Sequence, residues 1–395
     1  GSGKTKAFYI PALAEIATTK TSEYWVKVLA LYPRIELLKD QFAEAFSEAR
    51  KLDGLLSERG RPVITLGVYY GDTPESAGRF LATPPEKRSW SLHSYGTGWI
   101  CPFFLCPNPD CPSLSRDMVW YREDLEHEKE ENQKGIYGKY ARLRCPESEC
   151  GYEVTSNQIL LTREQMIKQP PDILFTTTEM LNRRLSRTAE QRLFGIDAAG
   201  KAPRLVLLDE IHTYEGVFGA QVAYLLRRWR HARARGSRAN LCIVGLSATL
   251  TSAETFFSKL TGVPLHRVRY VCPAEVDLVD EGIEYNVVLK GDPVSGTSLL
   301  STSIQTAMLL GRMLDPSATP SRGAYGTKIF AFADKLDVLN RWYHIEQEAE
   351  TRKNLSQFRD RNPELDSNAR RRCFLMGQEW TCLLYTSPSP RDRQK

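Results

Sequence analysis

The sequence predicts an α/β fold in which a parallel β-sheet is covered by helices. Short apolar runs alternate with segments of helical periodicity, and each run ends in a polar or glycine-bearing cluster. In an open parallel sheet such clusters lie together at the carboxyl edge, where ligands bind. The apolar runs are residues 28–32, 63–69, 172–175, 205–208 and 241–246.

Composition places the 395-residue chain among cytoplasmic globular proteins. Its hydrophobic content is 42%, and no window resembles a signal peptide or a membrane span, so no membrane contact is expected. The net charge of +5 is too small to indicate a partner. No acidic residue lies between Glu215 and Arg238. This arginine-rich segment is interpreted as a solvated basic face, with nucleic-acid contact as the alternative.

The first element is the closing half of a phosphate-binding loop, Gly1-Ser2-Gly3-Lys4-Thr5. In the full pattern G-x-x-x-x-G-K-[ST], backbone N–H groups surround the phosphates, the lysine reaches them and the hydroxyl residue reaches Mg²⁺. An apolar helical pattern follows directly, as such a loop requires. The alternative is an expression remnant that happens to precede Lys-Thr.

Acidic and hydroxyl residues follow two later apolar runs. Residues 205–208 lead into Asp209, Glu210 and His212, and residues 241–246 lead into Ser247 and Thr249. Beside a phosphate-binding loop, the first carboxylate holds Mg²⁺ and the second orients the attacking water. An isolated Asp-Glu pair is more often a turn, but the occurrence of all three motifs in this order predicts a nucleotide-hydrolysing site.

Residues 84–157, approximately, interrupt the α/β pattern and predict a zinc-binding insertion. Two copies of C-P-x-x-x-C offer paired thiolates that would close a tetrahedral site. The four cysteines are Cys106, Cys111, Cys145 and Cys150. Cys101 is an alternative to Cys106, and reduced thiols without a metal are the alternative to the site. Four thiolates leave no open position, so Zn²⁺ would be structural and would fold an insertion too polar to form its own core.

Taken together, these residues resemble superfamily 2 helicases of the DExH type, which have the RecA-like fold. Gly1–Thr5 is similar to the end of motif I, Asp209–His212 to motif II and Ser247–Thr249 to motif III. Further residues resemble the motifs that contact the nucleic-acid backbone in that family. They are Pro33, Arg34, Gln41, Gly71, Thr176, Thr177 and Thr178. Thr176–Thr178 are equally consistent with capping the helix that follows.

The resemblance implies ATP and Mg²⁺ as cofactors and gives each motif residue a role. Asp209 would hold Mg²⁺ with Thr5, and Glu210 would act as the catalytic base. His212, Ser247 and Thr249 would couple hydrolysis to nucleic acid. The residues expected at ATP are Gly1, Ser2, Gly3, Lys4, Thr5, Asp209, Ser247 and Thr249.

The domain organisation follows from the same resemblance. Residues 1–270 are expected to form the RecA-like ATP-binding domain, and residues 271–325 a linker with a helix. Residues 326–382 are expected to begin a second RecA-like domain, and residues 383–395 resemble a translated sequencing adaptor. The chain is therefore expected to be truncated at both ends. Nothing resembles motifs V and VI, which carry the arginine finger, so this chain alone is expected to hydrolyse ATP poorly.

The expected function is that of an ATP-dependent helicase or translocase on nucleic acid, with DNA favoured over RNA. The zinc insertion and the 291–298 stretch resemble large bacterial helicases of phage-defence or DNA-modification gene clusters, which implies defence or repair subunits as partners. Two alternatives remain open. One is a translocase on duplex DNA that does not unwind it, and the other is a non-enzymatic, zinc-dependent nucleic-acid-binding scaffold.

Overall fold

The computed structural model divides the chain into two units, Gly1–Pro273 and Ala274–Lys395. The structure describes residues 4–93, 96–113, 115–196, 201–236, 240–247, 250, 252–272, 287–289, 302–304, 306–307, 310, 331–332 and 336–347. Of the second domain expected at 326–382, only residues 331–332 and helix α12 (Leu336–Gln347) are described. The tail at 383–395 lies outside the described residues.

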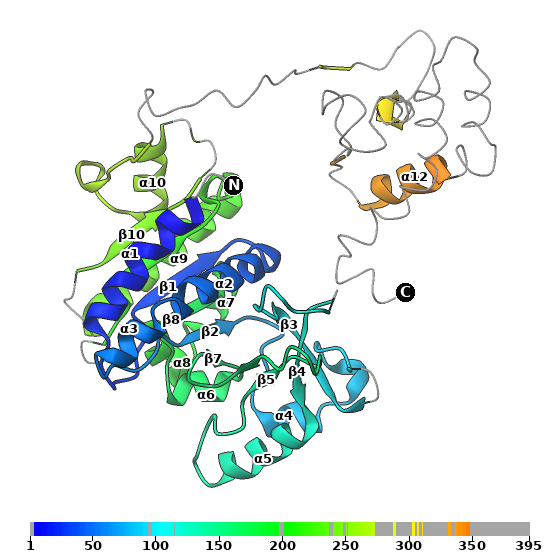
Figure 1. Ribbon diagram of the computed structural model, residues 1–395. Helices are drawn as coiled ribbons and strands as arrows, with labels where there is room; N and C mark the ends of the chain where they lie inside the picture. Colours follow the sequence, from blue (N-terminus) through cyan, green and yellow to red (C-terminus); the bar gives the residue numbers. More distant parts are fainter. Residues whose placement is uncertain are drawn as a thin grey trace, which may run out of the picture. The chain divides into compact units, whose positions relative to one another are not determined.

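Six parallel strands form the central sheet of the first unit, in the order β10-β9-β1-β8-β2-β7 (Figure 1). Their bounds are β1 (Val28–Tyr32), β2 (Leu66–Tyr69), β7 (Ile159–Leu160), β8 (Ile173–Thr177), β9 (Leu205–Leu208) and β10 (Cys242–Gly245). Because all the pairings are parallel, the carboxyl ends of the strands share one edge. The predicted fold class, a parallel sheet with flanking helices, is confirmed.

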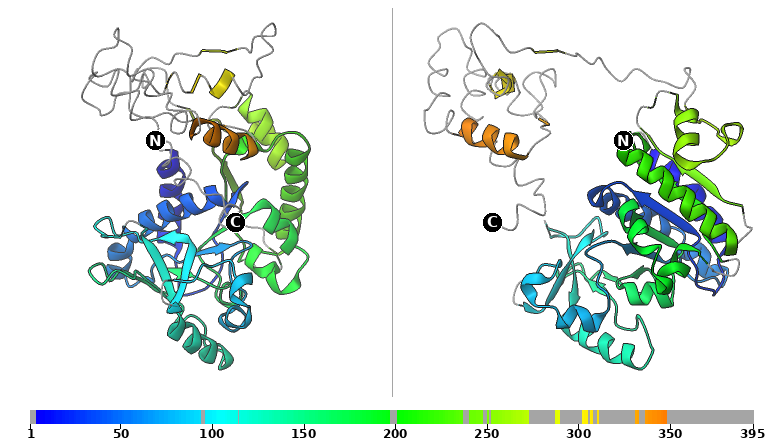
Figure 2. Two further views of the ribbon diagram at one scale, coloured as in Figure 1. Left: turned by 90° about the vertical axis from the view of Figure 1, so that its right-hand side faces the viewer. Right: turned by 180° about the vertical axis from the view of Figure 1, so that it is seen from behind.

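Helices cover both faces of this sheet. Side chains along β1 alternate: Val28, Ala30 and Tyr32 enter one core, whereas Leu29 and Leu31 enter the other. The first core is shared with α1 (Lys4–Thr19) and α2 (Ile35–Arg50), and the second with α7 (Thr178–Arg184) and α9 (Gly216–Gly236). The rear view in Figure 2 shows α9 in front of the sheet. Outside the insertion, the described part of the first unit also contains α3 (Asp53–Glu58), α6 (Arg163–Lys168), α8 (Thr188–Gln191) and α10 (Ala253–Thr261).

The chain leaves the parallel sheet after β2 and returns at β7, and the insertion lies between. It contains a four-stranded antiparallel sheet in the order β3-β4-β5-β6, with helices α4 and α5. The bounds are α4 (Ala77–Ala82), β3 (Gly98–Leu105), β4 (Asp117–Tyr121), α5 (Arg122–Gln133), β5 (Leu143–Arg144) and β6 (Glu153–Val154).

The insertion contributes buried aromatic residues to the core of the first unit, which the expectation of an insertion too polar for a core of its own did not include. Trp90, Trp99 and Trp120 are fully buried and belong to the same hydrophobic core as α1 and α2. Across the boundary, the ring of Phe42 lies 5.9 Å from that of Phe104. Sequence periodicity missed this core because its aromatic residues are scattered among charged ones.

The strand expected within residues 241–246 is β10, which is the outermost described strand on its side of the sheet, and its Cys242 is exposed. Among the described residues, no helix is both long and apolar enough to cross a membrane.

Close packing between β3 and β4 yields a testable prediction. A Cβ on Gly98 would lie 2.7 Å from both the Trp120 carbonyl oxygen and Val119 Cγ1. Because neither strand backbone has room to move, Gly98→Ala is expected to lower the free energy of unfolding by about 1–3 kcal/mol in urea titrations. Gly54→Ala, where a Cβ meets nothing within 4 Å, is the matched control and should not destabilise the protein. Equal stability of the two variants would contradict the prediction.

Candidate nucleotide, nucleic-acid and zinc sites

The acidic pair lies at the carboxyl edge, directly after β9. Asp209 is 5% exposed, and its Oδ1 accepts a hydrogen bond of 2.8 Å from the backbone N–H of Glu210. Burial raises the pKa of Asp209 above its usual range. Glu210 adopts the left-handed conformation, with φ 47° and ψ 47°, which is strained for a residue with a side chain. Thr213 holds this turn by donating from its backbone N–H and hydroxyl to the Glu210 carbonyl, at 2.9 and 2.8 Å.

A short chain of contacts links the turn after β9 to the turn after β10. Nδ1 of His212 lies 3.2 Å from Glu210 Oε2 and 3.4 Å from Ser247 Oγ. The backbone adds a hydrogen bond of 2.9 Å from Ile211 N to the Leu246 carbonyl. The structure thus brings Glu210, His212 and Ser247 together, as their positions in sequence predict.

Helix α1 begins close to this edge. Tyr9, in its second turn, is hydrogen-bonded through its hydroxyl to the hydroxyl of Tyr32, the last residue of β1. Both rings are fully buried, and burial raises the pKa of each hydroxyl. Sequence reasoning did not single out this pair. The first signal for it is an aromatic residue one turn after the Lys4-Thr5 motif.

The expected phosphate-binding residues are described only in part. Lys4 and Thr5 are the first residues of α1, and the structure describes their backbone only. The described residues do not include Gly1, Ser2, Gly3 and Thr249. The N-terminus of a 16-residue helix favours anions. A carboxylate such as Asp209 is the donor type that Mg²⁺ prefers. The chemistry of the described residues therefore fits a nucleotide with its cation.

The candidate nucleic-acid residues follow other strands at the same edge. Arg34 and Gly71 are exposed, and Pro33 and Gln41 are half-buried. Thr176, Thr177 and Thr178 are buried. The hydroxyl of Thr176 donates to the Tyr69 carbonyl at 2.6 Å, and that of Thr177 accepts from Met180 N at 3.2 Å. Both hydroxyls are therefore hydrogen-bonded to backbone groups within the protein, and the Thr177 contact caps α7.

The four cysteines of the insertion converge on one point. The sulfur atoms of Cys106, Cys111, Cys145 and Cys150 all lie within 4.8 Å of one another. Two of the separations are 3.5 Å, from Cys106 to Cys150, and 3.7 Å, from Cys111 to Cys145. Tetrahedral Zn²⁺ with bonds of about 2.3 Å requires sulfur separations of about 3.8 Å. The donor set and its size therefore fit Zn²⁺. Cys101 is in β3 and outside the cluster, so the geometry favours Cys106 as the ligand.

The thiols of this cluster differ in acidity. Burial raises the pKa of Cys145 to about 11 and also raises that of Cys106. A hydrogen bond from Asn108 Nδ2, at 3.3 Å, lowers the pKa of Cys150 to about 7. Cys150 is therefore more readily deprotonated near neutral pH than Cys106 or Cys145, and a bound cation would have to displace the protons of those two thiols.

Removal of one ligand tests the zinc site. Cys145→Ser is expected to abolish stoichiometric zinc in metal analysis and to lower the melting temperature by several degrees, because structural zinc contributes to folding. Hydrogen exchange should rise around β5 and β6 first. Cys101→Ala is the control and should retain zinc. Zinc retained by Cys145→Ser, or lost by Cys101→Ala, would contradict the assignment.

Comparison with known proteins identifies a helicase domain in the first unit. Residues 133–256 match the family model described as DEAD/DEAH box helicase. This range holds Asp209, Glu210, His212 and Ser247. Residues 133–256 therefore carry a helicase domain of the DEAD/DEAH class, which is of the superfamily 2 type.

Particular relatives are large proteins. Over 296 residues the chain is 30% identical to Druantia protein DruE of Escherichia coli (strain UMEA 4076-1). This alignment covers 67% of the present chain but only 15% of DruE. Over 124 residues it is 32% identical to the uncharacterised ATP-dependent helicase MJ1574 of Methanocaldococcus jannaschii, covering 29% of this chain and 17% of that one. The solved structure of Mycobacterium smegmatis helicase Lhr bound to ssDNA and AMP-PNP covers 98% of this chain and 35% of its own, at 18% identity and a TM-score of 0.46.

Proposed function

We propose that this chain contributes the ATP-binding domain of a nucleic-acid motor that couples ATP hydrolysis to movement on DNA. The observation that carries the proposal is the linked arrangement of Glu210, His212 and Ser247, at 3.2 and 3.4 Å, beside a buried Asp209. The match of residues 133–256 to the DEAD/DEAH box helicase model supports ATP as the fuel. DNA is favoured because the Lhr structure is described as bound to ssDNA.

Each residue has a part in the proposed mechanism. Lys4 and Thr5, at the start of α1, would bind the phosphates and their Mg²⁺, and Asp209 would also hold that cation. Bound Mg²⁺ would neutralise charge that develops on the phosphates. Glu210 accepts the proton of the attacking water. Nδ1 of His212 contacts both Glu210 and Ser247, so a change in the position of Glu210 on hydrolysis would reach the turn after β10.

The test of this proposal is nucleotide binding and DNA-stimulated hydrolysis with a Lys4→Ala control. A fluorescent ATP analogue should bind the present chain and lose affinity in Lys4→Ala. Hydrolysis is measured in a protein that also carries motifs V and VI, because this chain alone is proposed to turn over slowly. Stimulation by DNA that vanishes in Lys4→Ala supports the motor. If the affinity for nucleic acid is the same with and without ATP, and the same in Lys4→Ala, the result would support the scaffold instead.

The mode of movement and the pathway need separate assays. Strand displacement compared with triplex displacement distinguishes unwinding from translocation on duplex DNA. We also propose a role in a bacterial defence or DNA-repair complex, supported by the similarity to the Druantia protein DruE. Protection of cells from phage that is lost in Lys4→Ala would support the defence role.

A further inference from the structure

Three arginines of the arginine-rich helix α9 donate hydrogen bonds to backbone carbonyls of neighbouring segments. Arg227 donates to the Lys259 carbonyl at 2.6 Å, and Arg230 to the Thr261 carbonyl at 2.7 Å. Both carbonyls belong to the last turn of α10, so these arginines cap that helix. Arg233 is buried and donates to the Pro203 carbonyl at 2.9 Å. The interpretation of this segment as a solvated basic face is therefore wrong for the buried Arg233, whereas Arg227 keeps an exposed side chain.

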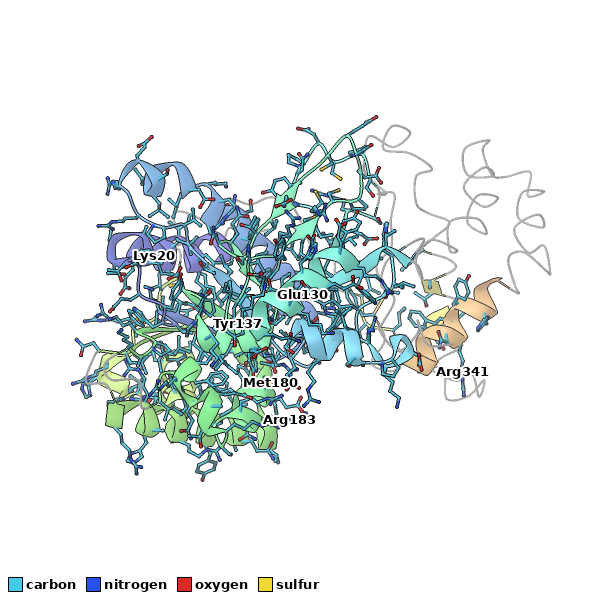
Figure 3. All side chains as sticks on the ribbon, turned by 90° about the horizontal axis from the view of Figure 1, so that it is seen from below. Lys20, Glu130, Tyr137, Met180, Arg183 and Arg341 are labelled. Atoms are coloured by element: carbon cyan, nitrogen blue, oxygen red, sulfur yellow. The ribbon has the colours of Figure 1, made fainter. Side chains whose placement is uncertain are left out.

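Two other arginines of α9 border a groove on the outer side of α9, next to α7. Its first cavity, of about 580 Å³, meets a second of about 330 Å³ at Arg228. Asn182, Gln221, Tyr224, Leu225 and Arg228 line the first. Leu185, Ser186, Gln191, Ile196, Arg228, Ala232 and Arg235 line the second. In Figure 3, the labels of Met180 and Arg183 mark α7. We call these two cavities the α9 groove.

The α9 groove combines an apolar floor with a cationic rim. Leu185, Ile196 and Leu225 are buried, whereas Arg228 and Arg235 are exposed. Tyr224 is 75% exposed beside them. None of the residues that line the two cavities is acidic. Arg228 donates to the neutral side chain of Asn182, at 2.6 Å, so this contact leaves its charge uncompensated.

Nucleic acid is a poorer match to this surface than a protein segment. A phosphate backbone is gripped by many cations. Here three arginines are engaged by backbone carbonyls, and the floor is aliphatic. The groove also runs along α9 away from the carboxyl edge, where the candidate nucleic-acid residues lie, toward the amino end of β9, where Arg233 bonds Pro203.

We propose that the α9 groove binds an acidic, amphipathic helical segment of a partner protein. Acidic side chains on that segment would pair with Arg228 and Arg235, and its apolar side chains would cover the leucine and isoleucine floor. From Gln221 to Arg235 the groove follows about 21 Å of α9, which matches about 14 residues of a docked helix. Laying an apolar helix face into a groove is a common mode of protein recognition.

The experiment selects binders for the full 395-residue chain from a phage-displayed library of random peptides, with Arg228→Glu as the counter-selecting variant. Selected peptides should carry net negative charge with apolar residues at helical spacing. Their affinity, measured by fluorescence anisotropy, should fall at least about tenfold in Arg228→Glu and in Tyr224→Ala, because each removes a contact worth about 1.4 kcal/mol or more. Lys129→Glu, an exposed charge reversal on α5, is the control and should change nothing.

The same series includes single-stranded oligothymidine as a competitor. Three outcomes would overturn the proposal: no peptide that depends on Arg228, selected peptides without acidic residues, or oligothymidine binding that is itself lost in Arg228→Glu. The last outcome would assign the α9 groove to nucleic acid. Circular dichroism of each variant confirms that a lost signal reflects the groove and not unfolding.

Discussion

Replacing Glu210 by glutamine is expected to lower the rate of DNA-stimulated ATP hydrolysis by about 10²–10⁴-fold, which is the usual contribution of a general base. The amide keeps the size of the side chain but cannot accept the proton of the attacking water. ATP binding should be nearly unchanged, because the proposed phosphate contacts come from Lys4 and Thr5. The measurement is single-turnover hydrolysis beside equilibrium binding of a fluorescent ATP analogue.

The matched control is His212→Ala, which removes the neighbour of Glu210 without removing the base. Nδ1 of His212 touches both Glu210 and Ser247. This variant is expected to keep basal hydrolysis and to lose stimulation by DNA. If Glu210→Gln retained full hydrolysis, the role of Glu210 as the base would be wrong, whatever the result for His212.

Replacing Asp172 by alanine is expected to destabilise the first unit by about 3–5 kcal/mol, because it leaves buried ammonium groups without their partner. Asp172 precedes β8 and is 3% exposed. Its Oδ1 lies 2.7 Å from Lys27 Nζ, and its Oδ2 accepts from Lys20 Nζ and from Thr65 N. Lys20 and Lys27 are 8% and 4% exposed, and Figure 3 labels the first of them.

Equilibrium unfolding in urea measures this effect. Burial lowers the pKa of Lys20, so the protein already disfavours its charge, and Asp172 is the group that offsets this cost. The control is Glu23→Ala, which removes the partner of Lys201 in an exposed pair of 3.1 Å and should cost under about 1 kcal/mol. A similarly small loss for Asp172→Ala would show that water solvates the two lysines.

The parallel sheet was predictable because its strands are buried on both faces and read as continuous apolar runs. Edge strand β7 was not predicted. It has two residues, Ile159 and Leu160, and so short a run carries no periodicity. Similarly, the runs at 63–69 and 241–246 are longer than β2 and β10, because apolar side chains continue beyond the ends of these strands.

The candidate site was predictable where its functional residues lie close together in the sequence, as in Asp209-Glu210 and the paired cysteines. It was not predictable where the contact joins distant segments. The Tyr9–Tyr32 hydrogen bond spans 23 residues, and the Asp172 cluster joins Lys20 to a residue 152 positions away. Such pairs depend on which helix covers which strand, and a single sequence does not contain that information.

The aromatic core shared between the insertion and the parallel sheet has a mechanical consequence. Phe42 touches Phe104 of the insertion and Phe175 of β8, and the ring of Phe175 stacks on Tyr32 at 6.1 Å. The hydroxyl of Tyr32 is in turn hydrogen-bonded to that of Tyr9 in α1. A displacement of the insertion would therefore be transmitted through these packed rings to α1, the helix that begins with Lys4. Exchanging the insertion for a plain loop would alter how stiffly the nucleotide end of α1 is held.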